Sequence, residues 1–329
     1  MKIKHFCCLF MILILTLTTT SCVNNLVPSF TGEPDYDYSY NPDANKKESD
    51  ITPVLYKVSD ENGFYVWLFG AISNPKQSYY TLPDYINDAF NESDYLAVKY
   101  DSIVSYPADV QQMAISKLFY NDDTSLKDHV ALDVYNETIK IVSDNIVYSE
   151  KYDKYIASYW STTIDSIVRE EIGIRNDAGL DKTFLTRAKN VDKPIKEIEY
   201  YAYVYEMISG YSYPLQEAML INSLYEHNNL DDFKKKREML YEAWENGSEA
   251  ELDKGFDSDF SMEIDATLYD EYVKETYTDR NSRIVAHIEN EIETGEKVFY
   301  CLDTFSVFGK NSVLDMLKSK GYIVEAIKS

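Results

Sequence analysis

The sequence is poor in cysteine and histidine, with four of each among 329 residues. Cys7, Cys8 and Cys22 lie close to the start of the chain, so only Cys301 remains for the rest of it. A single thiol builds neither a disulfide framework nor a thiolate metal site. The fold must therefore be held by a hydrophobic core, which a chain of this length can supply.

The sequence also lacks the common motifs of nucleotide binding and of serine hydrolysis. It has no glycine-rich phosphate loop and no dinucleotide fingerprint. Ser73 and Ser306 stand outside any Gly-x-Ser-x-Gly elbow, and no histidine is placed by a motif to act as their base. The histidines are scattered over the N-terminal segment and three helical patterns: His5, His129, His227 and His287.

Positive charge is scarce, since 32 Lys and Arg face 56 Asp and Glu, which leaves a formal net charge of −24. Such a chain repels polyanions, so we expect no recognition of nucleic acid or of anionic lipid by a basic face. Tyrosine, by contrast, is abundant, with 30 residues. A tyrosine ring packs against apolar neighbours while its hydroxyl stays hydrated, which favours amphipathic helix faces. A peptide- or glycan-binding surface is the alternative.

Residues 1–21 have the pattern of an export signal. Lys2 and Lys4 precede an apolar run from Phe6 to Leu17, and small residues follow before Cys22. The run is too short to cross a hydrocarbon core of about 30 Å at about 1.5 Å per residue. The end of this segment resembles a bacterial lipobox, which predicts that Cys22 is lipidated, for example with palmitate. Secretion with a free Cys22 is the alternative.

Residues 22–50 are rich in Pro, Asn and Asp and have no apolar period. This composition predicts a flexible acidic tether. The folded domain is expected over residues 51–329. Together these features predict an exported bacterial protein on the extracytoplasmic side, which contacts the membrane only through a lipid anchor at Cys22.

The first unit of the domain is predicted as a hairpin followed by a strand, a helix and a second strand. The first strand is expected from Phe64 to Phe69, with a tight exit at Gly70, and the second from Tyr95 to Val98. Thr81 is expected to cap the helix between them, with Pro83 just inside it. The functional edge of this unit is the turn from Gly70 to Ser73.

The last segment repeats this order. A helix is expected to open at Arg280-Asn281 and to end at Gly295, and a strand to run from Val298 to Leu302. A helix near Asn311 and a strand from Tyr322 to Ile327 complete the unit.

Between the two units, residues 107–277 have mainly helical patterns, most clearly over residues 151–172. The predicted fold is α/β (α+β), with a central sheet built from two similar strand-helix-strand halves and a large helical insertion between them.

Several segments, in this order, resemble the TraB/GumN family, which also holds the PrgY proteins and the Tiki metalloproteases. They are Gly70-Ala71-Ile72-Ser73, Gly179-Leu180-Asp181, Lys193 to Glu199, Tyr241 to Gly247, and Asp303 to Ser306. The resemblance implies a site in which two histidines and a glutamate hold a divalent metal that activates water.

This sequence departs from that pattern at the site itself. Ser73 and Ser306 replace the two histidines, Lys99 replaces the glutamate, and Asp303 replaces a glycine. A hydroxyl binds a divalent ion poorly and an ammonium repels it. The paired change at Lys99 and Asp303 suggests an ion pair in place of the metal, with independent drift of the two positions as the alternative.

We therefore expect a pseudoenzyme with no catalytic residues and no cofactor, which binds a peptide or protein in a residual pocket. That pocket would hold Asp101, Asp181, Glu199 and Arg280. One alternative is a metal-dependent hydrolase or protease in which Asp101, Asp181, Glu199 and Asp303 supply the ligands. The other is a structural surface protein whose acidic face serves solubility.

Overall fold

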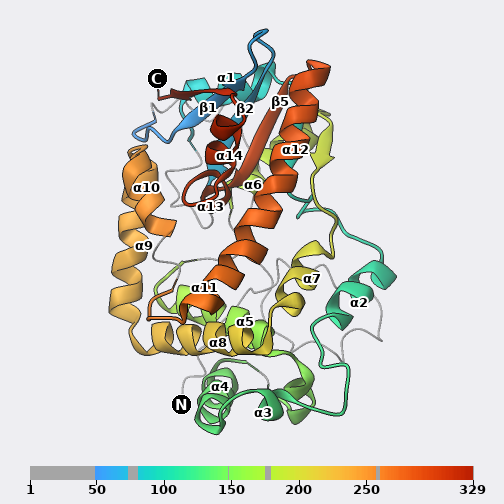
Figure 1. Ribbon diagram of the computed structural model, residues 1–329, viewed down its shortest axis with the longest axis vertical. Helices are drawn as coiled ribbons and strands as arrows, with labels where there is room; N and C mark the ends of the chain where they lie inside the picture. The colour runs from blue at the N-terminus through green and yellow to red at the C-terminus, as the bar shows by residue number, and fades with distance from the viewer. Residues whose placement is uncertain (1–48, 73–80, 147, 175–178, 257–259, 329) are drawn as a thin grey trace.

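The structure is a computed structural model that describes residues 49–72, 81–146, 148–174, 179–256 and 260–328. A six-stranded sheet with the order β4-β3-β5-β2-β1-β6 occupies the upper half of Figure 1, and helices form the lower half. The strands are β1 (Leu55–Ser59), β2 (Tyr65–Ala71), β3 (Tyr95–Val98), β4 (Ile195–Glu197), β5 (Val298–Asp303) and β6 (Ile323–Ile327).

The sheet joins the two ends of the domain. β1 pairs antiparallel with β2 and with β6, so the predicted hairpin is present and the C-terminal strand lies beside it. β5 inserts between β2 and β3 and is parallel to both, with Phe69 opposite Cys301 and Leu96 opposite Phe299. β4 is parallel to β3 at the other edge. The prediction of one central sheet formed by the two terminal halves is confirmed.

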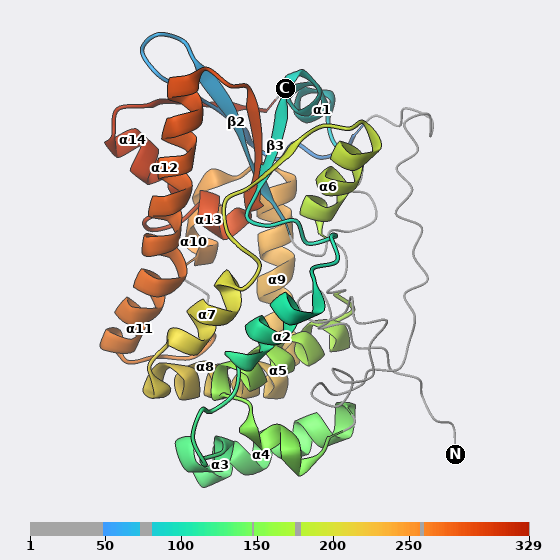
Figure 2. The same cartoon turned by 90° about the vertical axis from the view of Figure 1, so that its right-hand side faces the viewer.

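The helices form two groups. Around the sheet lie α1 (Asp84–Glu92), α6 (Leu180–Asn190), α12 (Asp279–Thr294), α13 (Thr304–Val307) and α14 (Val313–Ser319). The others are α2 (Ala108–Ser116), α3 (Leu126–His129), α4 (Leu132–Asn145), the 3₁₀ helix η2 (Glu150–Lys154), α5 (Ala157–Glu171), α7 (Tyr203–Gly210), α8 (Tyr213–Asn228), α9 (Leu230–Glu245), α10 (Glu249–Phe256), α11 (Ala266–Val273) and the π-helix η3 (Lys274–Thr278). Figures 1 and 2 show α9 and α12 running between the helical half and the sheet.

Each half of the molecule has its own hydrophobic core. In the sheet core, Phe69 of β2 packs against Phe184, Trp244 and Phe299, with ring centroids 5.8 to 6.2 Å apart. In the helical core, Tyr155 stacks on Tyr159 at 3.9 Å. Aromatic pairs at these distances contribute beyond the area that they bury. The two cores meet where α9 leaves the helical half and reaches the sheet.

The tyrosines are more deeply buried than their sequence pattern predicts. Five of them are almost completely inaccessible to solvent: Tyr56, Tyr155, Tyr159, Tyr205 and Tyr300. Burial raises the pKa of all five phenols above the ordinary value. The expectation of hydrated hydroxyls on helix faces is therefore wrong for these five, which serve as core residues.

The segment from Tyr241 to Gly247 attaches α9 to the sheet. Trp244 Nε1 donates a hydrogen bond of 2.7 Å to the Gly70 carbonyl inside the core. Gly247 adopts φ +60°, and a Cβ there would lie 2.5 Å from the Thr52 carbonyl oxygen. Only glycine fits such a close approach at positive φ without strain.

Strand β2 extends further than predicted, from Tyr65 to Ala71, and includes Gly70. Gly70 pairs with Leu302 of β5 instead of ending the strand. A Cβ at Gly70 would lie 3.3 Å from the Phe308 ring and 3.5 Å from Thr304 Cα, so the absence of a side chain lets α13 approach the strand closely. Gly70 is thus a packing position and not a turn.

Three helix starts differ from the predictions. α1 begins at Asp84 with Pro83 as its N-cap and without a side-chain capping bond, so the cap expected at Thr81 is wrong. The helix expected from residue 151 begins only at Ala157, because Ile156 N donates to the Leu118 carbonyl and ties the preceding turn to another segment. α14 starts at Val313, with the Ser312 hydroxyl as its cap.

Candidate functional site

The candidate site lies at the carboxyl ends of the parallel strands, where the sheet faces the helical half. Lys99 follows β3, Glu199 follows β4, and Asp303 ends β5. Arg280 is contributed by the first turn of α12. Glu199 N donates a 2.7 Å hydrogen bond to the Lys99 carbonyl, which continues the pairing of β3 and β4 beyond the strands. Ligand sites of open parallel sheets commonly lie at this edge.

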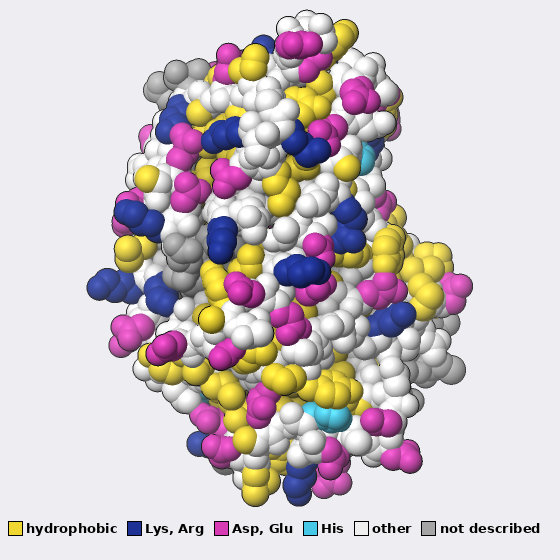
Figure 3. Space-filling view, in the orientation of Figure 1, with side chains coloured by type: hydrophobic (Ala, Val, Ile, Leu, Met, Phe, Trp, Pro, Cys, Tyr) yellow, Lys and Arg dark blue, Asp and Glu magenta, His cyan; other side chains and the backbone are white. Residues whose placement is uncertain are grey.

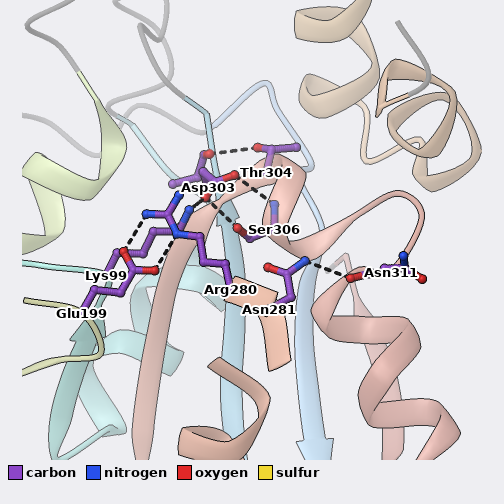
Figure 4. Close-up of polar contacts among 9 residues, drawn as sticks. Lys99, Glu199, Arg280, Asn281, Asp303, Thr304, Ser306 and Asn311 are labelled. Carbon is purple, nitrogen blue, oxygen red and sulfur yellow. Dashed lines mark hydrogen bonds and ion pairs between the residues drawn. The ribbon is translucent and has the colours of Figure 1, made fainter. Parts of the chain in front are cut away.

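Lys99 and Asp303 form the ion pair that the sequence suggested, and Figure 4 shows their side chains pointing toward each other. Asp303 is also the N-cap of α13, because its carboxylate accepts hydrogen bonds from Ser306 N at 2.9 Å and from Ser306 Oγ at 2.8 Å. Burial and the nearby Arg280 guanidinium lower the pKa of Lys99, whereas contact with a carboxylate favours its ammonium form. The ion pair therefore offsets part of the free energy that burial adds to the charged form of Lys99.

Glu199 and Arg280 form a second, deeper ion pair. Arg280 Nε and Nη2 donate to the two Glu199 oxygens at 2.5 and 2.6 Å, a bidentate geometry. Only 3% of the Glu199 side chain and 11% of the Arg280 side chain are exposed. Burial alone would lower the pKa of Arg280, but its hydrogen bonds to Glu199 outweigh burial and raise that pKa. Arg280 stays charged, and both Glu199 oxygens are occupied.

Of the other two carboxylates predicted in the pocket, Asp181 lies near Lys99, whereas Asp101 is paired elsewhere. Asp181, in the first turn of α6, lies close enough for its charge to act on Lys99, and burial raises its pKa. Asp101 binds Lys189 at 2.9 Å and accepts a hydrogen bond from Ile103 N. The structure thus brings Lys99, Asp181, Glu199, Arg280 and Asp303 together, whereas Asp101 contacts Lys189 and Ile103 instead.

Of the two serines that replace the family's histidines, the structure describes only Ser306. Ser306 is buried and binds Asp303, as described above. Ser73 lies outside the described residues. Of the remaining site positions, Gly70 lies one residue from the end of β2, and the Thr304 hydroxyl donates a 2.9 Å hydrogen bond to the Ala71 carbonyl beside it.

The described residues do not fit the divalent ion that the resemblance implies. Glu199 is paired with Arg280, Asp303 with Lys99, and Asp101 with Lys189. Within the described ranges, no three His, Cys, Asp or Glu side chains are grouped so that they could hold a metal ion. An ammonium and a guanidinium inside the cluster would also repel a divalent cation.

Two arginines that sequence reasoning missed lie next to this cluster. Arg169 of α5 and Arg237 of α9 line a cavity of about 170 Å³ together with Asp303, Thr304 and Phe305. A larger pocket of about 440 Å³ shares Arg237 and Phe305 with it and continues along α9. These arginines are 68 positions apart on different helices, so no local motif could have found them. The one local signal is Arg169 itself, a cation in the last turn of a helix whose residues are mostly buried.

Acidic side chains accompany these arginines. Glu226 of α8 accepts a 2.7 Å hydrogen bond from Ser261 Oγ. Burial and the charge of Asp165 raise its pKa to about 7, against the opposing effects of Ser261 and the two arginines. Burial also raises the pKa of Asp165. Burial beside Asp165 therefore favours the neutral form of Glu226.

Removing one member of the Glu199–Arg280 pair should destabilise the protein strongly. We expect Glu199→Gln and Arg280→Met each to lower the free energy of unfolding by about 3–5 kcal/mol, because each leaves a buried charge without its partner. The double variant should lose much less than the sum. Denaturant unfolding measures all three, with Glu289→Gln at the exposed Lys320 pair as control, for which we expect less than about 1 kcal/mol. Additive effects of the two single changes would contradict a coupled pair.

Glu226 should make stability pH-dependent in a defined direction. Its pKa is raised in the folded state, so the folded protein binds more protons than the unfolded chain between about pH 4.5 and 7. The free energy of unfolding contributed by this group therefore falls as the pH rises through that window. From pH 5 to pH 8, the free energy of unfolding of Glu226→Gln should rise by on the order of 2 kcal/mol relative to that of the wild type. The exposed Glu238→Gln change should gain nothing, and a pH-independent difference for Glu226→Gln would refute the assignment.

The model of the TraB/PrgY/gumN family matches residues 54–326, which covers nearly all of the described domain. No curated protein and no solved structure matches the chain. The family match includes all five clustered residues described above. The chain therefore belongs to the TraB/PrgY/gumN family.

Proposed function

We propose that this protein is a catalytically inactive member of its family that binds a peptide or protein segment at the carboxyl edge of the sheet. The observation that carries this proposal is the pairing of the site carboxylates with cations. Lys99 and Arg280 occupy Asp303 and both oxygens of Glu199, so these groups are not free to bind a metal. With its oxygens held in this way, the site has no described group poised to activate water.

The cavities beside the cluster support ligand binding. The 440 Å³ pocket falls within the range typical of ligand sites, and the 170 Å³ cavity connects its lining to the ends of β2 and β5 through Phe305 and Leu240. Both cavities are lined by apolar side chains together with charged ones. Such a mixture suits a peptide, which carries apolar side chains and polar backbone groups.

The surface charge limits the kind of partner. Figure 3 shows acidic and basic side chains intermixed over one face of the molecule, without a basic patch. The chain as a whole is strongly acidic. Nucleic acid and anionic lipid surfaces are therefore poor partners, since they require a concentrated positive face.

Peptide binding without cleavage is the direct test. We expect a degenerate peptide library to bind the purified protein and to be recovered intact by mass spectrometry, with or without added Mn²⁺, Co²⁺, Zn²⁺ or Ca²⁺. Phe305→Asp, which places a charge in both cavities, should abolish binding, whereas the exposed Leu132→Asp change on α4 should not. Metal-dependent cleavage would establish the metal-dependent hydrolase instead. Absence of any bound peptide would favour a purely structural surface protein.

We further propose that Cys22 carries a lipid that anchors the domain outside the cell membrane. No helix in the described part of the chain is long and apolar enough to cross a membrane. Residues 1–50, of which only the last two are described, hold the signal-like segment and the tether. In a bacterial host, labelled palmitate should be incorporated into the wild-type protein and not into Cys22→Ser, which should leave the membrane fraction. Label on both would place the lipid elsewhere.

A further inference from the structure

Arg169 and Arg237 are the unusual members of the cavity beside the site. Neither forms an ion pair with a carboxylate of the described residues, although every cation of the Lys99–Asp303 and Glu199–Arg280 cluster does. Arg169 Nε is buried and has no hydrogen-bond partner in that same part of the chain. A buried donor without a partner costs free energy, and a bound ligand that accepts its hydrogen bond would remove that cost.

The neighbouring carboxylates do not compensate for these two charges at close range. Asp165 forms no ion pair with either arginine among the described residues, and Glu226 Oε1 accepts from Ser261 Oγ. Asp303, which lines the same cavity, is held by Lys99 and Ser306. Burial and repulsion from Arg237 lower the pKa of Arg169, as expected where positive charge is incompletely balanced.

The cavity geometry suits an anionic group at the end of a larger molecule. Two guanidinium groups provide planar forks of N–H donors that match the two oxygens of an oxyanion. A cavity of about 170 Å³ admits such a group but not a whole peptide. The larger pocket beyond Arg237, lined by Leu240, Phe305 and Phe233, can take an apolar remainder.

The charge of the surroundings favours a singly charged ligand. Asp165, Glu226 and Asp303 lie around the two arginines and would repel a doubly charged phosphate more strongly than a carboxylate. We propose that Arg169 and Arg237 form a binding site for the carboxylate of a ligand with an apolar body. This site does not depend on whether the protein cleaves peptides, and it adjoins the Lys99–Asp303 pair, because Asp303 and Thr304 line the same cavity.

The test uses 3-phenylpropionate as a monocarboxylate with an apolar body and its neutral amide as the matched control. We expect the carboxylate at millimolar concentration to raise the melting temperature of the full chain at constant ionic strength, because it binds the folded state alone. The amide and inorganic phosphate should have much smaller effects. An equal shift with the amide, or a shift with phosphate alone, would overturn the proposal.

Variants separate ligand binding from a structural role. Arg169→Gln and Arg237→Gln should each weaken carboxylate binding at least about tenfold, since each removes charged hydrogen bonds. Without ligand, Arg169→Gln should melt at or above the wild-type temperature, because it removes an unpartnered buried donor. The exposed Arg283→Gln change should leave binding unaltered. Wild-type binding by the double variant, or a large loss of stability in unliganded Arg169→Gln, would refute the site.

Discussion

The insertion of β5 between β2 and β3 is the constraint on which the rest of the structure depends. Without β5, the hairpin formed by β1 and β2 and the pair formed by β3 and β4 would be separate pieces with open edges. Parallel pairing on both sides of β5 also aligns the carboxyl ends of four strands. Lys99, Glu199 and Asp303 come from distant parts of the chain and meet there only because of this alignment.

The chain uses its few buried cations in different ways. Lys99 and Arg280 are matched to single carboxylates, an arrangement that is costly to desolvate but strongly coupled once formed. Arg169 and Arg237 face several carboxylates at longer range and hold none of them. In an acidic protein, positive charge inside a cavity without a direct partner among the described residues marks the place where a bound anion best offsets the free energy that it loses on leaving water.

Much of the sheet could be predicted from the sequence because its central strands β2, β3 and β5 are mainly apolar runs. Local signals also mark the ends of neighbouring helices. Gly295, for example, ends α12 at φ +72°, as its position after an amphipathic repeat indicates. The Lys99–Asp303 contact could be suggested because both residues lie at the ends of predicted strands, at positions that the family resemblance places in one site. The late start of α5 could not, since the bond from Ile156 to Leu118 is a tertiary contact that no helical period reveals. The Arg169 and Arg237 cavity was missed for the same reason, because its lining comes from α5, α9 and the ends of β2 and β5, which meet only in the folded chain.

The pairing of β1 with β6 has a consequence for how the protein is made. Thr304, just after β5, bonds Ala71 across 233 positions of sequence, and β6 follows still later. Both edges of the hairpin formed by β1 and β2 therefore stay uncovered until β5 and β6 have been synthesised. Contacts of such long sequence separation form slowly, and exposed strand edges invite wrong partners in the meantime. A chain released before β5 would present the edge of β2 as a bare template for aggregation, because the strand that covers this edge comes from the other terminal half of the domain.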